Sequence, residues 1–98
     1  MKTPSLAARQ AAEMLSIQAL GFIAEEPERL ARFLALTGIE AEQIRAAAKA
    51  PGFLAGVLEH MLGDESLLVA FADSAGIDPA EIARARAALG GSRRPMTP

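Results

Sequence analysis

The fold class is decided by the stretch PGFLAGVLEHMLG, which runs from Pro51 to Gly63. Proline is tolerated in the first turn of a helix and glycine is common where a helix ends, so these two residues predict the bounds of one helix. Between them, the apolar residues recur in adjacent pairs every four positions, which is the spacing of one helix face. These positions are Phe53, Leu54, Val57, Leu58, Met61 and Leu62. We therefore predict an amphipathic helix that packs against other elements of a core.

Proline and glycine divide the rest of the chain into further helical stretches on both sides of this one. The chain has no tryptophan or tyrosine and only four phenylalanines, so the aromatic residues that favour sheets are scarce. A length of 98 residues suits a single domain. We predict an all-α fold, a compact bundle of six short helices within residues 5–90. The predicted helices are Ser5–Glu25 with Thr3 as its cap, Pro27–Gly38, Ala41–Ala50, Pro51–Leu62, one between Asp64 and Gly76, and one from Asp78 to Gly90–Gly91.

The ends of the chain and its longest apolar run indicate in which cellular compartment the protein is expected. Residues 1–4 are expected to form a flexible N-terminus and residues 91–98 a disordered tail. The segment Met14–Ala24 is apolar almost all round, which predicts a central helix that its neighbours cover on several sides. This uncharged run is well short of the roughly 20 residues that a membrane-spanning helix needs. With no secretion signal and no cysteine, we expect a cytoplasmic protein without a membrane partner.

The sequence is similar to itself at an offset of 38 residues, which pairs residues 26–52 with residues 64–90. The matching pairs are Leu30/Leu68, Phe33/Phe71, Gly38/Gly76, Ile39/Ile77, Ile44/Ile82 and Ala47/Ala85. Two three-helix units related by a pseudo-two-fold axis would explain this pattern. The alternative is chance, because any helix, glycine stop and second helix look alike in an alanine-rich chain.

The chain offers few groups for catalysis. It has no cysteine and a single histidine, His60, so one chain cannot build a thiolate site or a metal site with several histidines. It also lacks a Glu-x-x-His pair, a phosphate-binding glycine loop, a dinucleotide fingerprint and a nucleophile elbow. We predict no enzyme activity, no catalytic residue, no metal and no cofactor.

His60 is the one residue that could work as an acid or base. It lies beside Glu59 and four residues before Asp64, and contact with the Asp64 carboxylate would raise the pKa of its imidazole. A histidine near a helix C-terminus is also stabilised by the helix dipole without any catalytic role. We expect this structural role for His60.

Three apolar residues lie outside the helix faces that we predict to be buried in the core. They are Leu36 in the second helix, and Val69 and Ala70 in the fifth. If exposed, they form a patch of the kind that marks a protein interface, with Arg29 and Arg32 as charges at its rim. We predict a protein interaction or regulatory adaptor module whose partner is an unknown protein or a second copy of the chain. The alternative is that the bundle buries the fifth helix on both sides.

A nucleic-acid-binding protein of the helix-turn-helix type is the alternative function. Residues 72–82 have the spacing of alanine, glycine and isoleucine that such motifs show, and they lead to Arg84 and Arg86. Charge argues against it, because residues 50–83 contain six acids and no lysine or arginine. We therefore rank nucleic acid below a protein partner. A small-ligand sensor ranks third, since the sequence shows no polar groups that converge on a ligand.

Four short strings carry a family resemblance: EPERL from Glu26, FLALTGI from Phe33, PGFL from Pro51 and LGDE from Leu62. With these strings the chain resembles a bacterial domain-of-unknown-function family of short all-helical proteins, over roughly residues 10–90. The chain departs from the family pattern at Glu26 and Glu40, where an aspartate cap is expected, and this weakens two helix starts. The resemblance implies a helical fold, a bacterial cytoplasmic protein and no established activity, and it transfers no catalytic residue.

Overall fold

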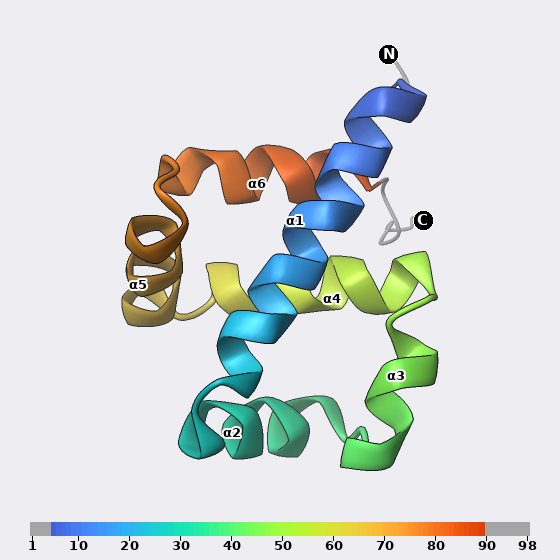
Figure 1. The fold of residues 1–98 in the computed structure, drawn as a ribbon, viewed down its shortest axis with the longest axis vertical. Helices are drawn as coiled ribbons and strands as arrows, with labels where there is room; N and C mark the ends of the chain where they lie inside the picture. The colour runs from blue at the N-terminus through green and yellow to red at the C-terminus, as the bar shows by residue number, and fades with distance from the viewer. Residues whose placement is uncertain (1–4, 90–98) are drawn as a thin grey trace, which may run out of the picture.

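A computed structural model describes residues 5–89, and every regular element in that range is helical (Figure 1). The elements are α1 (Leu6–Ala24), α2 (Pro27–Thr37), a 3-10 turn η1 (Ala41–Gln43), α3 (Ile44–Ala47), α4 (Pro51–Leu62), α5 (Glu65–Ala75) and α6 (Pro79–Ala88). The predicted all-α fold with six helices is confirmed. None of these helices is long and apolar enough to cross a membrane.

Local side-chain chemistry explains where several helices begin and end. The Ser5 hydroxyl and the Asp64 carboxylate each accept a hydrogen bond from the backbone N–H three residues later, at 3.0 and 3.2 Å. The Asp78 carboxylate accepts one from the N–H two residues later, at 2.9 Å. Each bond satisfies an N–H that has no partner within the helix. At the other ends, Gly38 and Gly76 stop α2 and α5 with φ of +76° and +70°, a left-handed conformation that favours glycine.

Two predicted helix ends need correction. The cap of α1 is Ser5 and not Thr3, which lies outside the described residues. Helix α6 ends at Ala88 with Leu89 as its cap, before the predicted stop at Gly90 and Gly91. Those glycines, the expected flexible N-terminus at residues 1–4 and the expected disordered tail at residues 91–98 also lie outside the described residues.

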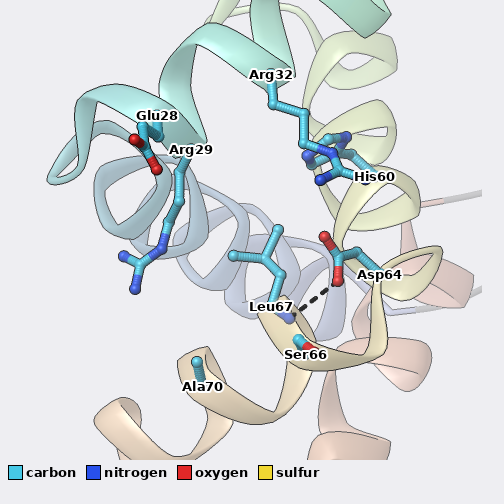
Figure 2. A pocket seen from close by; sticks show the side chains of 8 residues that line it. All are labelled: Glu28, Arg29, Arg32, His60, Asp64, Ser66, Leu67 and Ala70. Carbon is cyan, nitrogen blue, oxygen red and sulfur yellow. Dashed lines mark hydrogen bonds between the residues drawn. The ribbon is translucent and has the colours of Figure 1, made fainter.

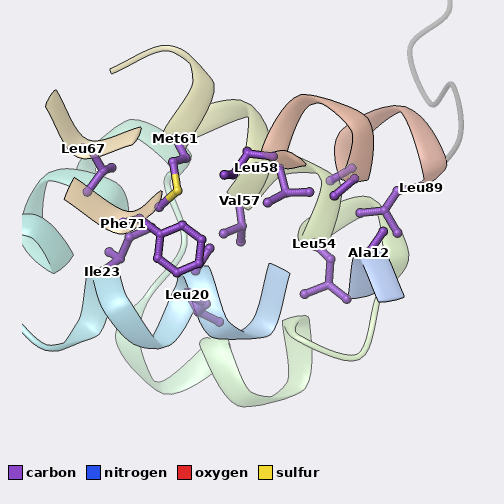
Figure 3. Close-up of a cluster of buried hydrophobic side chains, with 14 of the residues drawn as sticks. Ala12, Leu20, Ile23, Leu54, Val57, Leu58, Met61, Leu67, Phe71 and Leu89 are labelled. Atoms are coloured by element: carbon purple, nitrogen blue, oxygen red, sulfur yellow. The ribbon is translucent and has the colours of Figure 1, made fainter. Parts of the chain in front are cut away.

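The core forms where α1 crosses α4 and α6, which also contact each other (Figure 1). Helix α2 packs against α1, and α5 packs against α4 and α6. Figure 3 shows the side chains of this cluster. Its most deeply buried apolar members are Ala19, Ile23, Phe33, Val57, Leu58, Met61 and Ile82. The apolar face predicted for residues 51–62 therefore supplies much of the core, as its period implies.

The third predicted helix is shorter than expected. Residues 41–50 form the 3-10 turn η1, one turn of α-helix in α3, and a further turn before Pro51. The side-chain carbonyl of Gln43 accepts a hydrogen bond from the backbone N–H of Glu40 at 3.1 Å, which supports the tight first turn. Only half-buried residues, such as Ile44, anchor this segment to the core. With so little apolar area to bury, it does not sustain a long helix.

Helix α1 is central, but one of its faces is open, which corrects the prediction of cover on several sides. The side chains of Leu6, Met14 and Ile17 are 72%, 62% and 50% exposed. Gly21 is exposed in the interior of the same helix, and a methyl group built on its Cα would meet no atom within 4 Å. A glycine inside a helix costs about 1 kcal/mol relative to alanine. Nothing in the packing of the described residues offsets this cost.

Candidate functional site

Helices α2, α4 and α5 surround an open groove of about 400 Å³ on one side of the bundle (Figure 2). Helix α2 contributes one wall, the last turn of α4 contributes a histidine, and the first two turns of α5 form the opposite wall. The lining residues are Glu28, Arg29, Arg32, His60, Asp64, Ser66, Leu67 and Ala70. Charged, polar and apolar side chains from three helices therefore converge here. The sequence alone does not show this convergence, because the lining residues come from three separate segments of the chain.

The guanidinium of Arg29 is held in place by Phe22 at the end of α1. Its Nη1 donates a hydrogen bond to the Phe22 carbonyl oxygen at 3.2 Å, and its Cζ lies 4.1 Å from the centre of the Phe22 ring. The Phe22 ring in turn contacts the Phe71 ring, with 5.5 Å between their centres. Because the cation–π contact and the hydrogen bond act together, Arg29 loses little further freedom when it contacts a ligand.

His60 is half-buried and contacts the core. Its ring stands edge-on to that of Phe33, with 5.1 Å between the ring centres. Burial lowers the pKa of His60 below its usual value of 6.5; the Asp64 carboxylate opposes this shift, and the Arg32 guanidinium adds to it. The Asp64 carboxylate thus acts in the direction that the sequence indicates, but desolvation outweighs it, so the pKa of His60 falls.

The lowered pKa of His60 predicts how stability depends on pH. The unfolded chain binds a proton at this histidine more readily than the folded chain does, so stability is greatest above pH 6.5 and falls as the pH drops through 6.5 towards the folded pKa. Replacing His60 with phenylalanine keeps a ring beside Phe33 but removes the titration. We expect the stability of the His60→Phe variant relative to wild type to rise between about pH 7.5 and pH 5.5. Urea denaturation at both pH values measures this difference, and a fall would show that the pKa is raised.

Three residues of the groove, Ser66, His60 and Asp64, are of the types found in hydrolase triads. The Asp64 carboxylate bonds to the backbone N–H of Leu67, as Figure 2 shows, and among residues 5–89 no hydrogen bond links His60 to Asp64 or Ser66. A nucleophile and its base need such contacts. The described part of the chain also contains no cluster of three or more histidine, aspartate or glutamate side chains that could hold a metal ion.

Residues 9–92 match a known protein family, described as "Protein of unknown function (DUF3572)". The match spans most of the chain and includes every helix that forms the groove. The chain belongs to the DUF3572 family. No curated protein and no solved structure matches the chain. The resemblance to a domain-of-unknown-function family is thereby confirmed, and the description of that family names no activity from which roles could be assigned to residues.

The partner surface predicted from sequence partly coincides with the groove of this DUF3572 chain. Arg29, Arg32 and Ala70 line the groove. Leu36 follows Arg32 by one turn of α2, and its side chain is 67% exposed. Val69 does not line the groove but adjoins Ala70, and it is 51% exposed. The sequence missed His60 as a member of the site, because its contact with α2 depends on how the helices pack.

The two arginines proposed for nucleic-acid contact both lie in α6. The Nε and Nη2 atoms of Arg86 donate to the Glu59 Oε2 atom at 2.8 and 2.5 Å, and the Arg86 side chain is only 15% exposed. Arg84 is exposed and forms an ion pair with Glu81 at 3.2 Å. Both guanidinium groups therefore face a carboxylate of the same chain, which gives phosphate binding no support.

Proposed function

We propose that this DUF3572 protein is a non-catalytic interaction module of the bacterial cytoplasm, whose groove between α2 and α5 receives a segment of a partner protein. The observation that carries this proposal is the convergence of Arg29, Arg32 and Ala70 in one groove, with exposed Leu36 on the same wall. A solvent-exposed leucine beside positive charges is typical of the edge of an interface.

The charges of the groove suggest what kind of segment fits. Neither Arg29 nor Arg32 forms an ion pair within residues 5–89. The Asp64 carboxylate is already engaged by a backbone N–H of α5. A partner segment that combines an acidic side chain with an apolar one would pair with an arginine and cover Leu36. We therefore favour a short amphipathic segment as the occupant of the groove.

Replacing Arg32 with glutamate should weaken binding of the partner by about tenfold or more, because it reverses a charge in the groove, and Val69→Glu should do the same because it places a negative charge beside Ala70 at the groove's edge. Both side chains are exposed, so the helical content and the melting temperature should change little. The tagged protein and its variants are used to capture partners from cells that express it naturally. Any partner found is then purified and titrated by calorimetry. Ala83→Glu, at an exposed position of α6 outside the groove, is the matched control.

Three outcomes would contradict this proposal. A partner that binds Val69→Glu and Arg32→Glu as tightly as wild type does not use the groove. A large fall in the melting temperature of Val69→Glu would mean that Val69 belongs to the core. Captured material that disappears after nuclease treatment would favour the helix-turn-helix alternative, and would make Arg84 and Arg86 the next residues to change.

A further inference from the structure

The open face of α1 carries an apolar surface that the groove does not use. At 100° per residue, Leu6, Met14, Ile17 and Gly21 fall within about 80° of arc on this helix. All four are exposed, and the three apolar side chains are half or more accessible to solvent. Figure 1 shows α1 lying across α4 and α6, so that these two helices cover only one side of it. The apolar face is therefore continuous only from Met14 to Gly21, because exposed Gln10 separates Leu6 from it, and no element of residues 5–89 covers it.

Gly21 lies in this face, and neither its backbone conformation nor its packing within residues 5–89 requires a glycine. Its φ is not positive, and the space above its Cα is empty to 4 Å, so alanine would fit there. A glycine on an apolar helix face leaves a notch into which a side chain of a second helix can fit. Gly21 is thus an observation, separate from the exposed apolar side chains, that points to a partner helix.

We infer that a second copy of the chain docks on this face, with the two α1 helices antiparallel about a two-fold axis. Such an interface must be self-complementary, because the same patch lies on both sides. The α1 face meets this requirement, since it holds both the protruding Met14 and Ile17 and the Gly21 notch. If Met14 of one copy packs on Gly21 of the other, the two-fold axis crosses each α1 midway between its own Met14 and Gly21. Each of these residues then lies about 5 Å from the axis, measured along the helix.

Charge supports the antiparallel arrangement. The segment Met14–Ala24 contains no charged residue, so the contact between the Met14–Gly21 faces of two copies buries no charge from that segment, and half-buried Glu13 lies at its edge. Exposed Arg9 lies five residues before Met14, and exposed Glu26 lies five residues after Gly21. In the same register, Arg9 of each copy lies towards the C-terminal end of the other α1, where Glu25 caps the helix and Glu26 follows it, so opposite charges attract. A parallel arrangement would place like charges together.

This inference does not rest on the proposed function, because the groove residues belong to α2, α4 and α5. One helix face is smaller than a standard interface, so we expect a dissociation constant in the micromolar range. Sedimentation equilibrium of the full chain from about 1 μM to 1 mM should show a change from monomer to dimer. A wild-type protein that stays monomeric over this range overturns the inference.

Two variants test the face and its notch. Ile17→Glu should weaken the dimer by about a hundredfold, because it buries a charge in the apolar contact. Gly21→Ala should weaken the dimer by about tenfold while raising the melting temperature measured under monomeric conditions. Ala83→Glu, at an exposed position of α6, is the control and should dimerise as wild type does. The inference fails if Gly21→Ala dimerises as tightly as wild type, or if Ala83→Glu weakens the dimer as much as Ile17→Glu.

Discussion

Replacing Phe33 with alanine should lower the free energy of unfolding by about 3–5 kcal/mol. Phe33 is fully buried and is the residue through which α2 enters the core. Its ring packs edge-on against the rings of Phe53 and His60, with centre distances of 5.9 and 5.1 Å. A domain of this size has roughly 5–15 kcal/mol of stability in total, so the loss would be a large part of it.

Urea denaturation followed by circular dichroism measures this loss, and Leu36→Ala provides the control on the same helix. Leu36 is 67% exposed, so its truncation should change the free energy of unfolding by no more than about 0.5 kcal/mol. The Phe33 variant should also let water reach His60 and return its pKa towards 6.5, which NMR titration of the imidazole can follow. Equal losses of stability in the two variants would show that α2 is not anchored through Phe33.

The helix ends were largely predictable because the signals that set them are local. Gly38 and Gly76 take the left-handed conformation that their positions implied, and Asp64 and Asp78 cap the next helices through their own carboxylates. These interactions span two to four residues, so they depend little on how the helices pack. Residues 41–50 could not be predicted as well, because the length of a weak helix depends on the apolar area it buries.

The candidate site could be predicted only in part. The positions of Leu36 and Val69 outside the predicted buried helix faces correctly indicated that both residues are exposed. It could not show that α2 and α5 approach each other, or that Arg29 and Ala70 line the same groove, since these contacts join distant segments. The net direction of the His60 pKa shift could not be predicted from the sequence for the same reason. The neighbouring carboxylate is visible in the sequence, whereas burial against α2 is not.

The open face of α1 shows a further limit of sequence patterns. Met14 and Ile17 are as apolar as the residues that α1 buries, so hydropathy alone predicts that both are inside. Apolar atoms nonetheless supply much of the surface of folded proteins, and being apolar does not place a residue in the core. Only the positions of α4 and α6 decide which side of α1 is covered.

The two segments that are similar in sequence, residues 26–52 and 64–90, are also similar in structure over their first helices but differ after them. Phe33 and Phe71 are both buried, and Gly38 and Gly76 share one backbone conformation. The helices that follow these glycines differ, because α6 packs on both α1 and α4, whereas the main contacts of α3 are with η1. A duplication of the two units stays a prediction. The pairwise match of residues nevertheless implies an experiment on two equivalent positions.

Ile82→Ala should lower the free energy of unfolding by about 2–5 kcal/mol, whereas Ile44→Ala should lower it by only about 1 kcal/mol. The substitution is the same at two positions that the repeat pairs, so side-chain chemistry and helix propensity largely cancel. What differs is packing, since Ile82 is fully buried in α6, which packs on α1 and α4, whereas Ile44 is half-buried. Urea denaturation of both variants compares the losses. Equal losses would mean that the third and sixth helices anchor the bundle alike, and that the asymmetry of α3 and α6 has no energetic consequence.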